Sequence, residues 1–322
     1  MKNIGIICGG FSSEFDISVK SASTILSNFP AGYRPFLVVL SRDGFSVRIE
    51  GEVVDLNRVD FSFVYKGQRE KVDAAIIYIH GDPGENGKIQ AYLEIIGIPY
   101  VNSGPLASQL SFDKWYCNQF LRAFDIPVAK SIHLTNSAAT LNAAEIIERL
   151  GLPVFVKPCD SGSSYGIAKI SSADQLLPGI ENAFKEGRSV VVEAFLDGTE
   201  VTCGVYRTAE GVHALPITEI VSDNDFFDYE AKYLGKSQEI TPARVSQEVT
   251  ALVQNQAKNI YELLQLRSIA RIDFMVVNNV PHVIEVNTTP GFSNESIVPK
   301  MLGVAGISIT DFWASILKEE LK

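Results

Sequence analysis

The most constraining stretch of this sequence is RIDFMVVNNVPHVIEVNTTPG, which begins at Arg271 and predicts two strands joined by a short turn. Side chains alternate between the faces of a strand, so Arg271 and Asp273 share one face, as do Glu285 and Asn287. A turn centred on Asn279 sets Asp273 opposite Glu285 and Arg271 opposite Asn287. Two facing carboxylates repel each other unless a positive group lies between them.

A solvated sheet face explains a lone Asp or Glu, but here four polar groups converge on one face of an apolar hairpin. Carboxylate and amide oxygens are the ligands that a hard cation such as Mg²⁺ prefers. Protein-bound Mg²⁺ usually bridges one or two carboxylates to substrate phosphates. The hairpin therefore predicts a metal face, and it directs attention to residues upstream that could hold phosphate.

The bulk properties are those of an ordinary globular protein with 322 residues, a hydrophobic fraction of 46% and a charged fraction of 20%. The net charge of −10 argues against nucleic acid as a partner, because neutralising phosphates requires a basic surface. No apolar run reaches membrane-spanning length. The four cysteines and four histidines are scattered, which argues against a disulfide or zinc framework and favours a reduced, cytoplasmic protein.

The order of patterns along the chain predicts a mixed α/β and α+β fold in three parts. In residues 1–102, apolar strands alternate with helices, which favours a parallel α/β sheet. Residues 103–197 and 198–322 predict two α+β units, the first with a mostly antiparallel sheet. The stretch 223–245 has mixed charge and little periodicity, and loops of that length are often lids.

The candidate phosphate-binding element is Lys157, which ends an apolar strand and precedes the loop PCDSGSSYG. A lysine and several backbone N–H groups can surround a phosphate chain. This loop lacks the Walker A order, and a Gly/Ser loop alone is more often an ordinary turn. Glu193 and Glu200 leave the next strand and could accept from adenine and ribose, although on these residues alone solvation at a strand edge is the better explanation.

The N-terminal stretch GIICGGFSSE predicts a strand, a turn and a helix. It lacks the G-x-G-x-x-G fingerprint of dinucleotide-binding proteins. Its backbone N–H groups could hold a carboxylate or phosphate. Glu14 is then either a favourable acid in the first turn of a helix or a ligand group, and this stretch alone favours the structural role.

Taken in order, these pieces resemble the ATP-grasp ligases and, within them, the D-alanine–D-alanine ligases. The resemblance covers nearly the whole chain, and its blocks are GGFSSEFDISVKSA (9–22), HGDPGENGKIQAYLE (80–94), IPYVNSGPLAS (98–108), FDK (112–114), VKPCDSGSSYGI (156–167), EAFLDGTEVT (193–202), DYEAKY (228–233), RIDFM (271–275) and IEVNTTPGFSNESIVP (284–299). It implies a Rossmann-like N-terminal domain (1–102) followed by the central (103–197) and C-terminal (198–322) ATP-grasp subdomains, with ATP between the last two.

The resemblance also implies roles for individual residues. It assigns to ATP the residues Lys114, Lys157, Ser163, Ser164, Glu193, Ala194, Phe195, Glu200 and Lys232. Two Mg²⁺ ions, or Mn²⁺, would be held by Asp273, Glu285 and Asn287. The first D-alanine would meet His80 and the network of Glu14, Ser163 and Tyr233. Arg271 and the backbone of Gly291 would stabilise charge on the reacting carboxyl, and Ser296 with Ile297 would bind the second D-alanine.

The implied reaction joins two D-alanines through a D-alanyl phosphate, releasing ADP and phosphate for peptidoglycan synthesis. The family also implies a homodimer. The sequence departs from the family pattern at Phe15, Asn86, Ala91 and Tyr165, of which Phe15 and Tyr165 could alter the first-substrate pocket and the lid. Tyr233 favours the dipeptide over the D-alanyl-D-lactate ester.

Two alternatives stay open on the sequence. One is a ligase of another specificity, against which Glu14, Tyr233 and Ser296 argue. The other is an inactive nucleotide-binding protein, against which the conjunction of Lys157 with the hairpin residues argues, because facing carboxylates are costly in a site that binds nothing.

Overall fold

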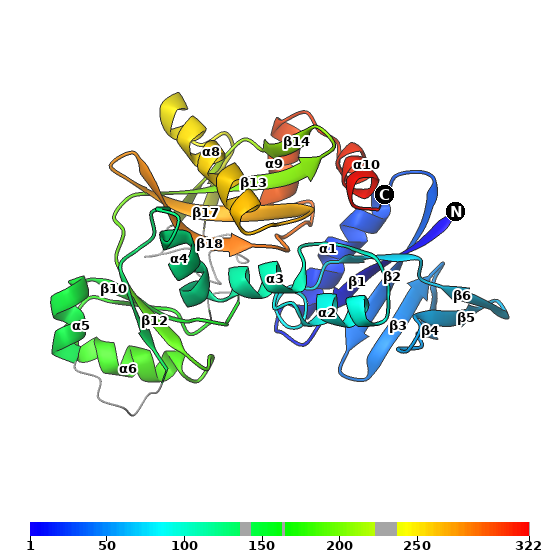
Figure 1. Cartoon of the computed structure of the whole chain (residues 1–322), viewed down its shortest axis with the longest axis horizontal. Helices are drawn as coiled ribbons and strands as arrows, with labels where there is room; N and C mark the ends of the chain where they lie inside the picture. The colour runs from blue at the N-terminus through cyan, green and yellow to red at the C-terminus, as the bar shows by residue number, and fades with distance from the viewer. Residues whose placement is uncertain (136–142, 163–164, 223–236, 322) are drawn as a thin grey trace.

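The computed structural model describes residues 1–135, 143–162, 165–222 and 237–321. Figure 1 shows three parts, with the N-terminal sheet on the right, the central unit at the lower left and the C-terminal sheet above it. The N-terminal elements are β1 (Lys2–Gly9), α1 (Phe15–Ser27), β2 (Tyr33–Ser41), β3 (Gly44–Ile49), β4 (Glu52–Asp55), β5 (Ser62–Tyr65), β6 (Gln68–Lys71), β7 (Ala74–Ile77), α2 (Lys88–Ile95) and β8 (Tyr100–Val101).

The N-terminal sheet has the strand order β4-β3-β2-β1-β7-β8. Strands β2, β1, β7 and β8 are parallel, as predicted, but β3 and β4 are antiparallel additions at one edge. The prediction of a parallel sheet is therefore confirmed for β2, β1, β7 and β8 and is wrong for β3 and β4. The reason is local, because β2 and β3 are joined by the short turn at Arg42 and Asp43, which reverses the chain without a crossover helix.

The central unit contains α3 (Pro105–Phe112), α4 (Lys114–Arg122), β9 (Ser131–Leu134), α5 (Ala143–Leu150), β10 (Val154–Pro158), β11 (Ala168–Ile170), α6 (Ala173–Ala183) and β12 (Val190–Ala194). Its sheet has the order β11-β10-β12-β9, and every pair is antiparallel, which confirms the prediction for this unit. Asp113 separates α3 from α4 and caps α4, because its side chain accepts from the Tyr116 amide. This cap fixes Lys114 as the first residue of α4.

The C-terminal part contains β13 (Thr199–Thr208), β14 (Gly211–Ala214), β15 (Thr218–Ser222), β16 (Ser237–Ile240), α8 (Gln247–Leu263), β17 (Ile269–Val277), β18 (Val280–Asn287), α9 (Ile297–Val304) and α10 (Ile309–Glu320). The main strand order is β16-β15-β13-β17-β18, and β14 pairs with β13. Where the sequence predicted one final helix, the chain ends in α9 and α10, which are bent by 100° relative to each other.

The β17–β18 hairpin has the predicted register at its polar end, with Asp273 opposite Glu285 and Arg271 opposite Asn287. The connecting turn is Asn278–Asn279, and both residues have the positive φ that a tight two-residue hairpin turn requires. That turn alone would set Asp273 opposite Ile284. A β-bulge after Asp273 shifts the register by one residue and brings the two carboxylates opposite each other.

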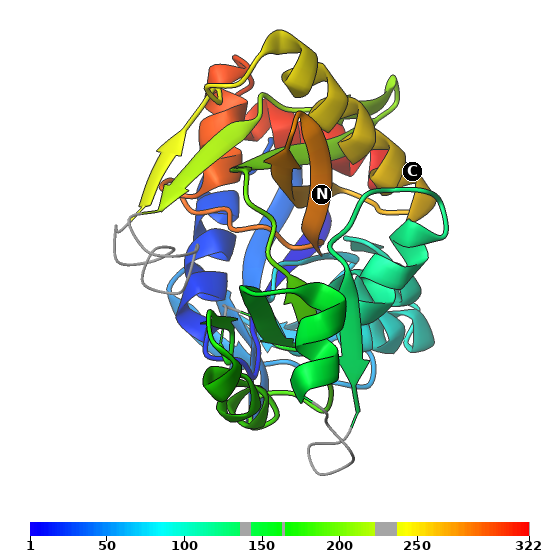
Figure 2. The same cartoon turned by 90° about the vertical axis from the view of Figure 1, so that its left-hand side faces the viewer.

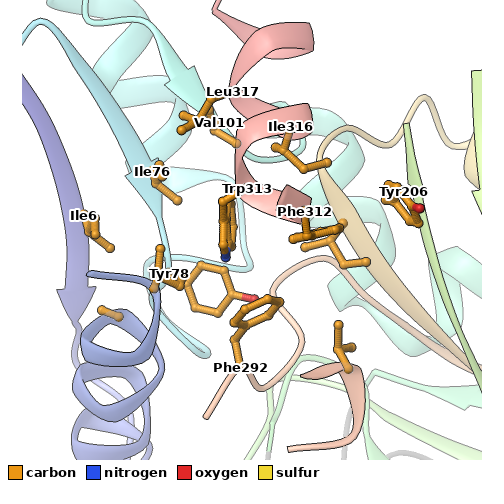
Figure 3. Packing of buried hydrophobic residues seen from close by; sticks show 14 of the residues in the cluster. Ile6, Ile76, Tyr78, Val101, Tyr206, Phe292, Phe312, Trp313, Ile316 and Leu317 are labelled. Atoms are coloured by element: carbon orange, nitrogen blue, oxygen red, sulfur yellow. The ribbon is translucent and has the colours of Figure 1, made fainter. Parts of the chain in front are cut away.

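The largest apolar cluster joins the N-terminal sheet to the C-terminal helices. Figure 3 shows Tyr78, Phe292, Phe312 and Trp313 packed together, with ring centroids 5.3–6.0 Å apart for five of their pairs. The Tyr78 hydroxyl also donates to the Pro290 carbonyl at 2.9 Å. This contact ties Tyr78, directly after β7 and two positions before the block that begins at His80, to the last site block in the loop that follows β18.

Figure 2, viewed from the left-hand side of Figure 1, shows the C-terminal sheet above the central unit. Over the described residues, no individual helix has both the length and the apolar character to cross a membrane; α9 and α10 taken as a bent pair meet those criteria by length and composition.

Candidate active site

A cavity of about 400 Å³ is lined by residues from all three parts of the chain. Of the predicted site residues, its walls include Glu14, His80, Lys114, Arg271, Glu285, Asn287, Gly291, Ser296 and Ile297. Asp273 lies beside this cavity through its contacts with Arg271. Outside its lining are Lys157 on β10, Glu193 and Ala194 on β12, Phe195 directly after β12, and Glu200 on β13. Ser163, Ser164, Lys232 and Tyr233 lie outside the described residues.

The positive group beside the facing carboxylates is Arg271. Its Nε and Nη2 atoms donate to the two oxygens of Asp273 at 2.8 and 2.7 Å, which is a bidentate pair between largely buried side chains. Asn287 donates to Asp273 at 3.1 Å, and Thr202 on β13 donates to the same carboxylate. The predicted repulsion is therefore relieved within the chain.

The metal prediction rests on two carboxylates and one amide. In the described part of the chain, no group of three or more His, Cys, Asp or Glu side chains is arranged to hold a metal ion. Asp273, Glu285 and Asn287 are nevertheless an all-oxygen donor set on adjacent strands, which fits a hard cation that also takes ligands from phosphates. Both oxygens of Asp273 already accept hydrogen bonds, so a cation there would share or replace those of Arg271.

The two predicted phosphate lysines are both buried but have different partners. Lys114 donates to the Ser161 carbonyl at 2.7 Å, which draws it to the loop after β10. Lys157 donates to Glu193 at 2.7 Å across the β10–β12 pair. Burial opposes the charge of Lys157, but the adjacent Glu193 carboxylate outweighs it and raises the pKa of Lys157.

The other oxygen of Glu193 accepts from Asn118 of α4 at 3.0 Å, and Glu193 is only 5% exposed. The alternative of a solvated strand edge is therefore wrong for this residue. Each carboxylate oxygen has two lone pairs, so Glu193 can still accept a further hydrogen bond. The backbone amides of Ala194 and Phe195 donate to the carbonyls of Lys130 and Pro153. Glu200 is half-buried at the start of β13.

Glu14 sits just before α1 and is 8% exposed. Its carboxyl lies against two glycines, because a Cβ atom added to Gly81 or Gly162 would be 3.7 or 3.2 Å from its Oε2 atom. The N-terminal turn, the loop after β7 and the loop after β10 therefore meet at this carboxyl. Glu14 is the N-cap residue of α1 by position, and its side chain makes no cap hydrogen bond.

His80 forms part of the same wall, and both of its ring nitrogens have partners. One lies 3.1 Å from the Ser21 hydroxyl, and the other hydrogen-bonds the backbone of Thr289. Burial lowers the pKa of His80, which Glu14 and the Thr289 hydrogen bond only partly oppose. His80 is thus a neutral side chain that joins α1 to the segment after β18.

At the other end of the cavity, Ser296 caps α9 by position but makes no side-chain cap bond. Its hydroxyl instead contacts Ser293, accepting from the Ser293 amide at 3.0 Å. Gly291 packs against it, and a Cβ at Gly291 would lie 3.1 Å from the Ser296 hydroxyl. The N-terminus of α9, with Ile297 as its first residue, therefore presents backbone N–H groups of the kind that bind a carboxylate.

Three polar residues near the predicted groups were not predicted. Glu85 and Ser111 line the cavity, and Asn118 holds Glu193. Ser111 is 4% exposed and its hydroxyl has no hydrogen-bond partner among the described residues. The block HGDPGENG contains Glu85, so a signal existed, but no periodicity distinguishes Ser111 or Asn118 from other helical residues. Phe15 is not in the lining: it packs on the core beside Gly9.

The chain matches two family models that together span most of its length. The model described as D-ala D-ala ligase N-terminus matches residues 3–103, and that described as D-ala D-ala ligase C-terminus matches residues 120–318. The chain belongs to the D-alanine–D-alanine ligase family. The resemblance inferred from the sequence blocks is thereby confirmed.

Relatives in this ligase family match over the full chain. The D-alanine–D-alanine ligase of Porphyromonas gingivalis is 45% identical over 321 residues, which are 99% of this chain and 97% of the relative. That of Parabacteroides distasonis is 43% identical and covers 100% of this chain and 98% of the relative.

Solved structures of the family confirm the predicted ATP-grasp fold class. D-alanyl-alanine synthetase A from Vibrio cholerae superposes with a TM-score of 0.88 at 30% identity, covering 100% of this chain and 99% of that one. The VanG D-Ala:D-Ser ligase of Enterococcus faecalis gives 0.87 at 29% identity, with 98% of each chain covered. A D-alanine–D-alanine ligase from Bacillus anthracis, in complex with ATP, gives 0.79 at 28% identity, covering 100% and 98%.

Proposed function

We propose that this chain uses ATP to join two D-alanine molecules into D-alanyl-D-alanine, through a D-alanyl phosphate, for peptidoglycan precursor synthesis. The observation that carries the proposal is the single cavity to which Glu14, Lys114, Arg271 and Ser296 all contribute. It offers a carboxyl for an ammonium, cations for phosphate and a helix N-terminus for a carboxylate. These are the charges of a reaction between two zwitterions and ATP.

For ATP, Lys114 and Lys157 neutralise the phosphates, with Ser163, Ser164 and Lys232 contributing from outside the described residues. Glu193 accepts from the adenine amino group, flanked by the backbone of Ala194 and Phe195, and Glu200 binds the ribose. The buried Lys157–Glu193 pair supports this assignment, because both partners are held in place before the nucleotide arrives.

For the amino acids, Glu14 pairs with the ammonium of the first D-alanine, with Ser163 and Tyr233 in the same network. His80 positions this wall rather than donating to the substrate, since both of its ring nitrogens are engaged. Ser296 and Ile297, at the start of α9, bind the carboxylate of the second D-alanine.

Two Mg²⁺ ions, or Mn²⁺, are proposed for Asp273, Glu285 and Asn287, and when bound they would neutralise charge on the phosphates. Arg271 has a role in either case. Its guanidinium is held by Asp273, and it can turn toward the oxygen that becomes negative when the acyl carbon is attacked. The backbone at Gly291 supplies a second donor there.

The chemistry has two steps. The carboxylate of the first D-alanine attacks the γ-phosphate, which forms the acyl phosphate and releases ADP. The amine of the second D-alanine then attacks the acyl carbon, and phosphate leaves from the tetrahedral intermediate. No nucleophile from the chain is needed, so catalysis consists of placement and charge neutralisation. Water must be excluded because it would hydrolyse the acyl phosphate.

The test measures phosphate release from ATP and Mg²⁺ with D-alanine, L-alanine, D-alanine plus D-lactate, and D-alanine plus D-serine, with products identified by mass. We expect release with D-alanine alone and D-alanyl-D-alanine as the product. A product containing lactate or serine in preference to the dipeptide would reassign the second-substrate site. ATP binding without D-alanine-dependent release would contradict the proposal.

The proposed function also includes the domain limits, the oligomeric state and the location of the protein. We propose the domain limits 1–102, 103–197 and 198–322, a homodimer and a cytoplasmic location. The four cysteines are free and buried, which accords with a reducing compartment. Sedimentation of the purified chain at several concentrations tests the dimer, and a monomer at all of them would contradict it.

A further inference from the structure

The wall of the cavity near Glu14 contains a second acidic side chain, Glu85, in the loop between β7 and α2. The loop holds it by two hydrogen bonds to one residue. The Glu85 amide donates to the Gly81 carbonyl at 2.9 Å, and the Glu85 carboxyl accepts from the Gly81 amide at 2.8 Å. The carboxyl is thus fixed in place on a tight turn, with one edge toward the cavity.

Glu85 and Glu14 converge on the same glycine. Gly81 donates to Glu85, and a Cβ at Gly81 would lie 3.7 Å from the Glu14 carboxyl. Gly81 has a φ of +71°, which favours glycine, and a Cβ there would first meet Ser12, at 2.9–3.0 Å, and then the Glu14 carboxyl at 3.7 Å. Both acids therefore lie next to Gly81 and line the same cavity space. His80 adds no donor to that space, because Ser21 and Thr289 engage its ring.

The charges around Glu85 come from three other elements. Burial raises the pKa of Glu85 to about 8, and Glu14 and then Glu285 of β18 act in the same direction. The Gly81 amide and Arg271 of β17 oppose this increase without cancelling it. A buried carboxyl beside other carboxyls is unfavourable as an anion unless a cation joins it. The cation that the proposed reaction brings to this end of the cavity is the substrate ammonium.

We propose that Glu85 is a second binding residue for the ammonium of the first D-alanine. The bound ammonium then lies between the carboxyls of Glu14 and Glu85. This inference rests on the proposed function. An ammonium has three N–H donors, and two carboxyls satisfy more of them than one does. When D-alanine binds, the protonated Glu85 carboxyl releases its proton to solvent and pairs with the substrate as a carboxylate. The pair of acids then selects for a free α-amino group.

The experiment compares the wild type with Glu85→Gln, and with Glu94→Gln as a matched control on the exposed face of α2. D-Alanine is titrated calorimetrically at about pH 7, with Mg²⁺ and a non-hydrolysable ATP analogue, in phosphate and in Tris. The two buffers differ in ionisation enthalpy, so the comparison counts protons released on binding. Steady-state kinetics separately give the KM values of the first and second D-alanine.

We expect proton release in the wild type and in E94Q, and its loss in E85Q. The KM of the first D-alanine should rise at least about tenfold in E85Q, as expected when a charged hydrogen bond is lost, while the second KM changes little. Glu85→Asp keeps the acid and should restore proton release with an intermediate KM. Equal losses in both KM values and in thermal stability would indicate a structural role and overturn the inference.

Two outcomes remain decisive if E85Q does not fold. Wild-type enzyme that binds D-alanine without releasing a proton overturns the inference by itself, and so does E85D without proton release. The proposed function is judged separately, by D-alanine-dependent phosphate release from the wild type. Wild-type turnover combined with no proton release would therefore refute the role of Glu85 and leave the ligase activity intact.

Discussion

The nucleotide-side residues and the first-substrate end of the cavity handle buried charge in opposite ways. Among the β-strands, each buried cation has an internal partner: Lys157 pairs with Glu193, and Arg271 pairs with Asp273. At the first-substrate end, Glu85 lies close to Glu14, and its hydrogen bond comes from a backbone amide. The buried cations of the strands are thus paired before any ligand arrives, whereas the proposed function brings a cation, the substrate ammonium, to the other end.

The difference follows from what each end must bind. In the proposed function ATP arrives with several negative charges, and a rigid framework of paired charges would keep the lysine and arginine oriented before it binds. In the proposed function a zwitterionic amino acid brings a single ammonium, and the two acids Glu14 and Glu85 would favour its binding. The following predictions test this contrast, from the largest expected effect to the smallest.

Replacing Asp273 by Asn should abolish turnover while leaving the fold intact. The amide still accepts from Arg271 and Thr202, but the charge that fixes Arg271 and serves the proposed metal is lost. We expect a loss of about 10²–10³-fold or more in kcat, the size found when one charge-stabilising group is removed. Phosphate release and thermal unfolding check this, with Asp55→Asn on β4 as control. Normal turnover in D273N would remove Asp273 from the chemistry.

Replacing Lys157 by Met should destabilise the fold, because Glu193 is left buried without its counter-charge. Breaking such a pair typically costs about 3–5 kcal/mol, whereas replacing both partners by apolar residues costs much less. The double variant K157M with Glu193→Leu should therefore unfold at a higher denaturant concentration than K157M. Urea titration measures both, with the exposed Lys185→Met as control. Additive losses would show that the pair does not act as a unit.

The stability of the wild type relative to E85Q should fall as pH rises. Folding raises the pKa of Glu85 from 4.5 to about 8. The stability contribution of a carboxyl with a raised pKa is fully present below about 4.5 and is lost as pH rises to about 8. Across this pH range the melting temperature of E85Q should therefore rise relative to that of the wild type. The expected rise is about 2–4 °C for each kcal/mol of unfolding free energy that the wild type loses. A constant difference would contradict the raised pKa.

The smallest effect is expected for the exposed pair of Lys20 and Glu295, 3.1 Å apart at the edge of the cavity. Both side chains are more than half exposed, so solvent screens the pair. Lys20→Met should leave the melting temperature unchanged within error at high and low salt. A clear, salt-dependent fall in the melting temperature would show that the contrast between buried and exposed ion pairs is too simple.

The sequence allowed much of the site to be predicted because its blocks are local. Glu14, Lys114 and Ser296 lie at helix starts and Arg271 lies within an alternating strand, where short-range patterns are informative, and all four line one cavity. The antiparallel edge of β3 and β4 and the hairpin of β5 and β6 were missed, because short strands with exposed residues carry weak periodicity. The division of the last helix into α9 and α10 was missed for a similar reason.

Other features depend on packing between distant segments and could not be read from periodicity. The hydrogen bond from Asn118 to Glu193 joins residues 75 positions apart, and Glu85 gains its raised pKa from burial and from Glu14. The hairpin illustrates both cases. The sequence predicted that Asp273 faces Glu285. The two-residue turn by itself would give a register shifted by one residue, and the β-bulge after Asp273 restores the predicted pairing.

The sequence by itself determined the family, the fold class and the set of charged groups, because strand alternation, helix capping and motif order are properties of neighbouring residues. The tertiary structure alone decided which charges meet. It placed Arg271 on Asp273 and Lys157 on Glu193, and it set Glu85 close to Glu14 around Gly81. The physical reason is that the energy of a buried charge depends on its distance to other charges and to water, and folding sets both distances.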